Sequence, residues 1–222
     1  LNHYAQQTNH EKVPYDVASE NVWGIDKASW LLRLCNTNLN LHTSGGWKGF
    51  ENVYQGNSLK TNGASISVNG VQGQDAKVPL REFDILIANP PFGSQESRET
   101  ARQFYTNSEE IHREVEALFL KRSFDFVRPG GDIVILLPKT LIKGPKFRGL
   151  QEWIREHAII NSVVHLPLVT FRPFESEIKT VVMHMTKKDE ESEQRSIYFD
   201  AATYVGHDGK GNKISRNDLP TI

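Results

Sequence analysis

The stretch FDILIANPPF at residues 83–92 decides how the rest of the sequence is interpreted. Its first six residues are apolar except for Asp84, a pattern typical of a strand buried on both faces of a parallel sheet. Pro90 and Pro91 cannot continue a sheet's hydrogen-bond ladder, so the backbone must leave the sheet directly after Asn89. The stretch therefore predicts a central strand that ends in a rigid polar turn.

Predicted strands and helices alternate on both sides of this stretch, and this pattern favours an α/β fold with a doubly wound sheet. Residues 60–80 suit a hairpin and residues 93–108 a mobile surface loop. A weak helix is expected over 1–10 and mostly loop over 201–222. The other strands are predicted at 22–25, 52–55, 132–137, 159–166, 180–185 and 197–199, and the helices at 28–42, 111–127 and 147–157.

The composition is that of an ordinary globular chain. Its 222 residues include 26 basic and 27 acidic side chains, which exclude a histone-like polycation and require any nucleic-acid surface to be local. No run approaches the ~18 apolar residues of a membrane helix, and no secretion signal opens the chain. The single cysteine, Cys35, is expected in the core of the protein. Because one cysteine can form no internal disulfide, a reducing cytoplasm is the expected setting, and no contact with a membrane is expected.

Polar side chains follow three of the predicted strands. Ligands of doubly wound sheets lie at the carboxyl ends of the strands, where Asp26, Asn57 and Asn89 are expected. The carboxamide of Asn89 and the backbone carbonyl of Pro90 offer two acceptors, and Phe92 offers a flat apolar ring. Two acceptors and a ring suit a planar group with an exocyclic amine, such as a nucleobase. The alternative is a rigid turn without a chemical role.

Other candidate motifs carry weaker signals. His157, His165 and His184 lack the spacing of metal ligands, so we expect no metal site. GHDGKG at 206–211 lacks the Ser or Thr of a phosphate loop and is expected to be a flexible turn. Basic side chains around the predicted strand ends could form a rim for DNA phosphates, the alternative being solvated loop charges. They are Arg98, Arg102, Lys139, Lys143, Lys146 and Arg148.

The sequence resembles the N6-adenine DNA methyltransferases, in particular the modification subunits of type I and related restriction-modification systems. The resemblance covers about residues 20–190 and implies a Rossmann-like class I S-adenosylmethionine-dependent methyltransferase sheet. Methyltransferases of ribosomal RNA guanine and of release-factor glutamine use tetrapeptides similar to NPPF, so such enzymes are an alternative. The matching stretches are GIDK (24–27), FDILIANPPFGS (83–94), RPGGDIVILLP (128–138), VVHLPLVTFRPF (163–174) and IKTVVMHMTKK (178–188).

The resemblance implies catalytic roles for the tetrapeptide Asn89, Pro90, Pro91 and Phe92. Asn89 and the Pro90 carbonyl are expected to accept hydrogen bonds from the adenine amine and to draw its lone pair out of conjugation. Phe92 is expected to stack on a base flipped out of the duplex, with Phe171 as the second wall.

The resemblance also implies a cofactor group for S-adenosylmethionine. Asp26, followed by Lys27, is expected to bind the ribose hydroxyls, although Asp26 could instead cap the following helix. Asn57, followed by Ser58, stands where the family usually has an aspartate that contacts the adenine amine of the cofactor. The carbonyl of an asparagine can still accept that hydrogen bond, and the reaction requires no metal.

One family motif is missing. The glycine-rich cofactor loop should precede Asp26, yet residues 1–23 contain no glycine. Since Leu1 is not an initiator methionine, we expect a catalytic domain over 1–190 that lacks its first strand and this loop, followed by an extension over 191–222. Such a chain is expected to bind S-adenosylmethionine poorly and to be inactive by itself.

Together the motifs predict a site-specific N6-adenine DNA methyltransferase. Residues 187–222 are too few for a DNA-reading domain, so the expected partners are DNA, a specificity subunit and a restriction subunit. Two alternatives remain open at this point: an RNA or protein glutamine amino-methyltransferase that shares NPPF, and a non-catalytic assembly module.

Overall fold

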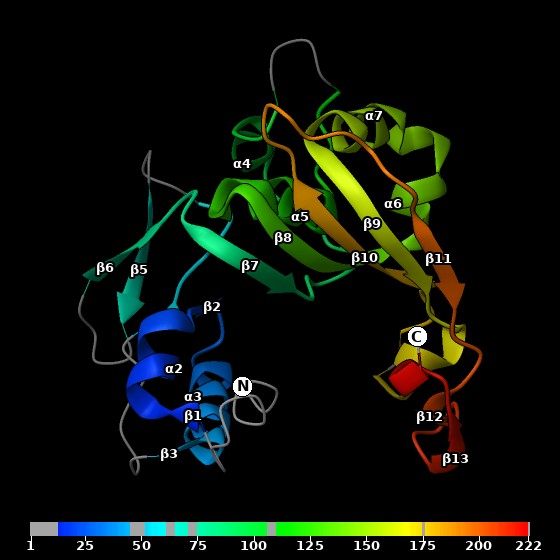
Figure 1. Cartoon of the computed structure of the whole chain (residues 1–222), viewed down its shortest axis with the longest axis horizontal. Helices are drawn as coiled ribbons and strands as arrows, with labels where there is room; N and C mark the ends of the chain where they lie inside the picture. The colour runs from blue at the N-terminus through cyan, green and yellow to red at the C-terminus, as the bar shows by residue number, and fades with distance from the viewer. Residues whose placement is uncertain are drawn as a thin grey trace. The chain divides into compact units, whose positions relative to one another are not determined.

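In the computed structural model the chain forms two compact units, residues 1–79 and 80–222 (Figure 1). The catalytic domain predicted over 1–190 spans parts of both units and stays a prediction. The weak helix predicted at 1–10 lies outside the described residues. The structure describes residues 13–44, 52–60, 65–70, 75–105, 110–174 and 176–221.

The first unit contains one strand-helix-strand motif and the predicted hairpin. Strand β2 (Gly24–Asp26) pairs in parallel with β4 (Val53–Gln55), and α3 (Ser29–His42) connects them. The hairpin of β5 (Ser65–Gly70) and β6 (Asp75–Pro79) continues the sheet in the order β2-β4-β5-β6. The remaining elements of this unit are β1 (Val13–Pro14), α2 (Tyr15–Asn21) and β3 (Thr43–Ser44).

Apolar residues of three elements form the core of the first unit. Ala18, Leu32 and Val53 are buried together, and Cys35 packs against them from α3. Burial raises the pKa of the Cys35 thiol. The core position predicted for this cysteine is therefore confirmed, although the side chain is only partly buried.

The second unit is built on a five-stranded sheet in the order β11-β9-β10-β8-β7. Strand β7 runs parallel to β8, and β10 runs antiparallel to both β8 and β9, so that β7, β8 and β9 all point the same way. Their carboxyl ends therefore lie along one edge of the sheet. The strands are β7 (Phe83–Ala88), β8 (Val127–Pro138), β9 (Ala158–His165), β10 (Thr180–Lys187) and β11 (Tyr198–Ala201).

Helices cover one face of this sheet. Ile133, Ile135 and Leu137 of β8 are completely buried against apolar side chains of the second unit's two longest helices, α5 and α7, whereas the alternate residues of β8 are only half-buried. Figure 1 looks onto the other face of the sheet. The helical segments of the second unit are α4 (Arg98–Arg102), α5 (Val115–Phe126), α6 (Lys139–Lys143), η1 (Pro145–Phe147), α7 (Arg148–His157), η2 (Leu168–Phe174) and η3 (Leu219–Thr221).

The prediction that residues 83–88 are buried on both faces was wrong. The side chains of Ile85 and Ile87 are 62% and 80% exposed. The cause is the position of β7 at the end of the five-stranded sheet, where helices of the second unit cover only one of its faces. An apolar run alone cannot distinguish an edge strand from a central one.

Two segments predicted as loops contain regular structure. Residues 98–102 of the predicted loop form α4, whose first turn is capped by Ser97 as its side chain accepts a hydrogen bond from the Thr100 amide at 3.1 Å. Residues 201–222 were predicted to be mostly loop, yet they include the hairpin of β12 (Val205–His207) and β13 (Lys213–Asn217).

Lys187, at the end of β10, stabilises the end of α5. Its Nζ donates hydrogen bonds to the carbonyls of Phe124 at 2.5 Å and Val127 at 2.8 Å, and burial lowers the pKa of this amine. Replacing Lys187 by methionine leaves both carbonyls without this donor, so the free energy of unfolding is expected to fall by ~1.5 kcal/mol and Tm by about 4 °C. Thermal unfolding checks this, with the exposed Lys210→Met as a control that should leave Tm unchanged.

Candidate active site

Asn89 lies at the carboxyl end of β7, as predicted. Its side chain is exposed and has no hydrogen-bond partner among the described residues, whereas the neighbouring Pro90 is buried and holds the backbone in place. Both prolines remove backbone donors from the turn. The turn therefore presents the Asn89 carboxamide with its full hydrogen-bonding capacity.

Two phenylalanine rings meet beside this turn. Phe92 and Phe171 lie edge to face, with ring centroids 6.2 Å apart and ring planes at 87°. Phe171 belongs to η2, which follows the carboxyl end of β9, and both rings are half-buried. The structure thus brings together two residues 79 positions apart that the resemblance had paired, although their base-stacking roles stay predictions.

The segment after Phe92 is fastened to the chain that leads into α5. Gly93 adopts a positive φ of 75°, a conformation that glycine favours. The Ser94 carbonyl then accepts a hydrogen bond from the Val115 amide at 3.1 Å, and the Glu96 amide donates one to the Arg113 carbonyl at 2.9 Å. These hydrogen bonds give the turn a fixed position relative to α5.

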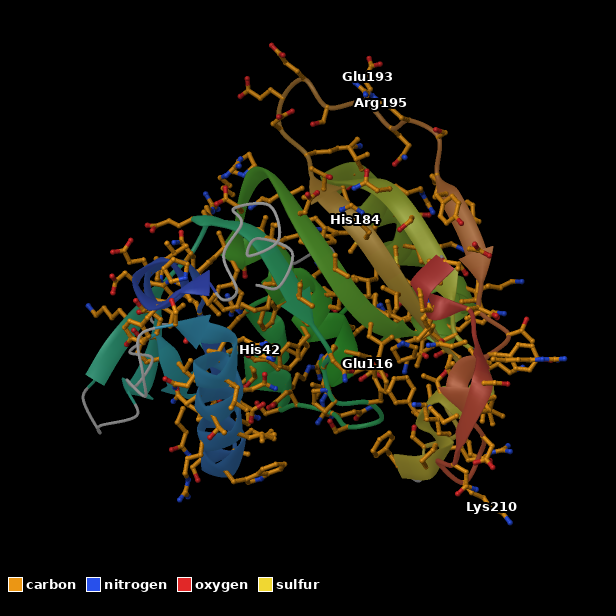
Figure 2. All side chains as sticks on the ribbon, turned by 60° about the horizontal axis from the view of Figure 1, so that its bottom comes forward. His42, Glu116, His184, Glu193, Arg195 and Lys210 are labelled. Carbon is orange, nitrogen blue, oxygen red and sulfur yellow. The ribbon has the colours of Figure 1, made fainter. Side chains whose placement is uncertain are left out.

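Glu116 is a buried acid beside the same turn, and sequence reasoning missed it. Its side chain, labelled on α5 in Figure 2, is 8% exposed and hydrogen-bonds to the backbone of Gly93. Burial raises the pKa of this carboxyl, and its Oε2 has no hydrogen-bond partner within the part of the chain that the structure describes. An acid between the apolar Val115 and Ala117 of the predicted helix was the available signal.

His112 lies between two aromatic rings. Its ring is 3% exposed and lies 4.9 Å from the ring of Phe147 and 6.0 Å from that of Tyr105. Burial, together with the charges of Lys146 and Lys121, lowers the pKa of the imidazole below 6.5 and outweighs the opposing carboxylates Glu110 and Glu114. His112 is therefore neutral in the folded chain at neutral pH.

This imidazole makes stability depend on pH. The unfolded chain takes up the His112 proton near pH 6.5 while the folded chain resists it, so stability is full above that pH and falls as the pH drops toward the lower folded pKa. The loss is at most ~1.4 kcal/mol per pH unit for one proton. His112→Phe and His112→Gln are both expected to remove this component from denaturant titrations between pH 7.5 and 5. An unchanged pH profile in both variants would contradict the assignment.

The predicted basic residues do not form one rim: Lys139 and Lys143 belong to α6, directly after the carboxyl end of β8, whereas Arg98 and Arg102 belong to α4, which lies away from that edge in Figure 1. Lys146 forms an ion pair with Glu114, so its charge is partly neutralised. Burial and the charges of Lys139 and Lys143 lower the pKa of His165 at the end of β9, which shows that these two amines lie close to the strand end. The predicted basic residues with exposed side chains are Arg98, Arg102, Lys143, Lys146 and Arg148.

The predicted cofactor residues lie together in the first unit, at the carboxyl ends of β2 and β4. The Gly56 amide donates to the Asp26 carbonyl at 3.0 Å, which joins the two strand ends. Oδ1 of Asp26 accepts a hydrogen bond from the Ala28 amide at 2.7 Å. Asp26 is not the cap of α3, the alternative considered for it, because the N-cap residue is Ala28. The other carboxylate oxygen of Asp26 has no protein partner among the described residues and remains available to a ligand.

Asn57 and its neighbours form the turn after β4. The Asn57 carboxamide oxygen accepts a hydrogen bond from the Leu59 amide at 3.1 Å, while its amide nitrogen is unpaired within the described ranges. Lys27 accepts a hydrogen bond from the Gln55 side chain through its backbone carbonyl, at 3.1 Å, and Ser58 is half-buried in the turn. The structure thus gathers Asp26, Lys27, Asn57 and Ser58 at one end of this sheet.

A cavity of about 440 Å³ adjoins these strand ends in the first unit. Asp26 lies at its polar part, and Leu31, Cys35 and Leu39 of α3 supply apolar walls. A carboxylate with a free oxygen beside an apolar cavity fits a ribose whose neighbouring ring needs an apolar surface. The residues present are therefore compatible with a nucleoside cofactor.

Within the ranges described above, no group of three or more His, Cys, Asp or Glu side chains is arranged to hold a metal ion. No helix in the described part of the chain is long and apolar enough to cross a bilayer.

Comparison with known proteins identifies the family. A model of the family N-6 DNA Methylase matches residues 4–222. The chain belongs to this family. Among curated proteins, the methylase subunit of the Escherichia coli type I restriction enzyme EcoEI is 24% identical over 173 residues, which cover 76% of this chain and 31% of that subunit.

Solved structures confirm the class of fold for this N-6 DNA methylase. A type I restriction-modification methyltransferase subunit from Streptococcus thermophilus matches with a TM-score of 0.62 at 19% identity, over 88% of this chain and 39% of that one. A Listeria monocytogenes protein described as a class I S-adenosylmethionine-dependent methyltransferase matches with a TM-score of 0.60 at 17% identity, over 82% and 49%. The chain thus has the predicted methyltransferase fold and spans less than half the length of each of these relatives.

Proposed function

We propose that this N-6 DNA methylase transfers a methyl group to the N6 amine of adenine in DNA, as the modification subunit of a type I-like restriction-modification system. The observation that carries the proposal is the turn after β7, where an unpaired Asn89 carboxamide stands beside the Phe92 and Phe171 rings. The similarity to the EcoEI methylase subunit supports the type I assignment.

The base is held by residues of the second unit. The Asn89 side-chain carbonyl and the Pro90 backbone carbonyl accept the two amine protons of an extruded adenine. Both hydrogen bonds withdraw the nitrogen lone pair from the ring and direct it at the incoming methyl carbon. Phe92 stacks on the base, and because Phe171 meets it edge to face at 6.2 Å, the Phe171 ring must turn or withdraw for a base to stack between them.

The cofactor is held by residues of the first unit. The oxygen of Asp26 that is not bonded to Ala28 would accept a hydrogen bond from a ribose hydroxyl, and the Asn57 carboxamide would hydrogen-bond to the adenine of the same molecule. When bound, S-adenosylmethionine supplies a methyl group activated by a sulfonium sulfur. The chain's own contribution is alignment of the amine nitrogen, since direct displacement depends on proximity more than on a strong base.

DNA and other subunits are the proposed partners, in the cytoplasm. The exposed basic side chains near the strand ends of the second unit suit phosphate contacts, which position a duplex without reading its sequence. Sequence recognition is assigned to a specificity subunit, and a restriction subunit is the further partner of such a system.

Transfer of a labelled methyl group from S-adenosylmethionine tests the substrate class. The natural gene product, with the subunits that copurify with it, is offered duplex DNA, structured RNA and protein extract in parallel. The proposal predicts label in DNA at the adenine amine. Label only in RNA or in protein glutamine would assign the alternative amino-methyltransferase activities, and no label with confirmed cofactor binding would favour an assembly module.

A further inference from the structure

The β12–β13 hairpin is fixed at its base to the edge of the sheet where β9 ends. The Ala202 amide donates a hydrogen bond to the His165 carbonyl at 2.9 Å, and the Ala202 side chain is buried. The Asp218 carboxylate, just after β13, accepts hydrogen bonds from the amides of Thr203 at 2.7 Å and Tyr204 at 2.9 Å. Both ends of the hairpin are therefore tied down.

The loop of this hairpin lies in the segment 206–211, where a flexible turn was predicted, and the structure forms a turn there with its own hydrogen bonds. The Asp208 carboxylate accepts three hydrogen bonds, from the Lys210 amide at 2.8 Å and from the Asn212 amide and side chain at 2.9 Å each. The hydrogen bonds from Asn212 are the main reason that the pKa of Asp208 is lowered. A carboxylate that organises its own loop in this way fixes the backbone over 208–212.

The loop packs its glycines against η2. A Cβ added to Gly209 would lie 2.9 Å from Arg172 Cδ, and one added to Gly211 would lie 3.3 Å from Pro173 Cβ. Figure 1 shows the hairpin beside this segment, below the carboxyl ends of β9 and β11. The side chain of Lys210 points outward from the hairpin tip in Figure 2, and the two glycines bring the backbone of the loop close to η2.

The contacted segment has little support of its own. None of the residues of η2 is buried, and it contains Pro173. Its local hydrogen bonds include those from the Thr170 amide to the Pro167 carbonyl at 3.0 Å and from the Ser176 amide to the Phe171 carbonyl at 3.2 Å. A short 3₁₀ segment without buried side chains depends on its neighbours for a fixed position.

We propose that the β12–β13 hairpin is a positioning element for the target base: its loop holds η2 where Phe171 faces Phe92. The inference rests on the proposed function, because it assigns the hairpin to the same base-binding site. It gives residues 205–217 a role in methyl transfer without contact with the base. Gly211 lies against Pro173 of η2, the backbone of η2 connects Pro173 to Phe171 two residues earlier, and Phe171 contacts Phe92.

Two glycines of the hairpin provide a matched pair of variants. Gly211 and Gly206 have nearly equal positive φ values, 84° and 82°, so alanine strains the backbone equally at both. The added Cβ of Gly211→Ala presses on Pro173, a rigid ring of η2, whereas the nearest atoms to that of Gly206→Ala belong to Asn217 of β13, with Nδ2 at 3.4 Å. Equal losses of Tm with unequal losses of function isolate the contact with η2.

Two readouts are measured on the natural gene product with its subunits. Hydrogen exchange of the Thr170 and Ser176 amides is expected to be about tenfold faster in Gly211→Ala than in Gly206→Ala, since local opening of η2 becomes easier. For DNA methyl transfer, kcat/KM is expected to fall about tenfold in Gly211→Ala and less than threefold in Gly206→Ala. In a Phe171→Ala background, Gly211→Ala is expected to cause no further loss.

The possible outcomes distinguish the positioning role of the hairpin from the proposed function of the protein. Equal effects of the two glycine variants, or additive effects of Gly211→Ala and Phe171→Ala, would overturn the positioning role while leaving the proposed function intact. Faster exchange in Gly211→Ala together with an absence of DNA methylation in the unaltered protein would instead overturn the proposed function. The hairpin would then support η2 without a role in base binding.

Discussion

Replacing Asn89 by alanine is expected to lower the rate of methyl transfer to DNA by about 10²- to 10³-fold, the loss typical of removing one preorganised polar group from a reacting centre. The reason is specific to this side chain: its carboxamide is unpaired among the described residues and is placed by the rigid turn that follows β7. Transfer of labelled methyl groups under single-turnover conditions gives the rate directly.

The controls separate catalysis from folding. Asn89→Asp keeps an oxygen acceptor at the same position and is expected to retain activity within about tenfold of the unaltered protein. Because the Asn89 side chain is exposed and makes no hydrogen bond within the described ranges, its loss is expected to leave Tm unchanged. An alanine variant that methylates DNA at the normal rate would remove Asn89 from the mechanism.

Replacing Phe92 by alanine is expected to lower kcat/KM for duplex DNA by about 30-fold, because stacking of one base on one ring contributes ~2 kcal/mol. The half-buried ring stands beside the turn and contacts Phe171 edge to face. The loss should be smaller for a target adenine that is already unpaired, since extrusion from the duplex then needs less compensation. Steady-state kinetics on paired and mismatched duplexes measure this difference.

Phe174→Ala supplies the matched control for aromatic loss. Phe174 belongs to the same segment as Phe171 but is 76% exposed, so its removal is expected to leave kcat/KM within about twofold. Equal losses on truncation of Phe92 and Phe174 would show that aromatic surface in general, rather than one stacking ring, supports the reaction.

Much of the candidate site follows from local sequence. Consecutive prolines after an apolar run fix a strand end in any context, and the polar residues after β2, β4 and β7 lie where parallel strands place ligands. In the same way, the helical spacing of apolar residues predicts helix α3, and the turn residues predict the β5–β6 hairpin. Such features depend on neighbours a few positions away.

The parts that could not be predicted depend on distant packing. Whether β7 lies at the edge of a sheet is decided by which strands pair with it, and the exposure of Ile87 is invisible in an apolar run. Glu116 and His112 acquire their perturbed pKa values from burial against segments that approach only after folding. The link from Gly211 to Pro173 likewise joins residues that no local pattern relates.

Sequencing that detects N6-methyladenine in the DNA of cells that express the natural gene product tests the central claim most directly. The proposed function predicts methylation at a defined sequence motif, absent from cells without the gene and lost when Asn89 is replaced by alanine. Unmodified adenine in cells with confirmed expression of the gene product and its subunits would contradict an adenine-N6 DNA methyltransferase.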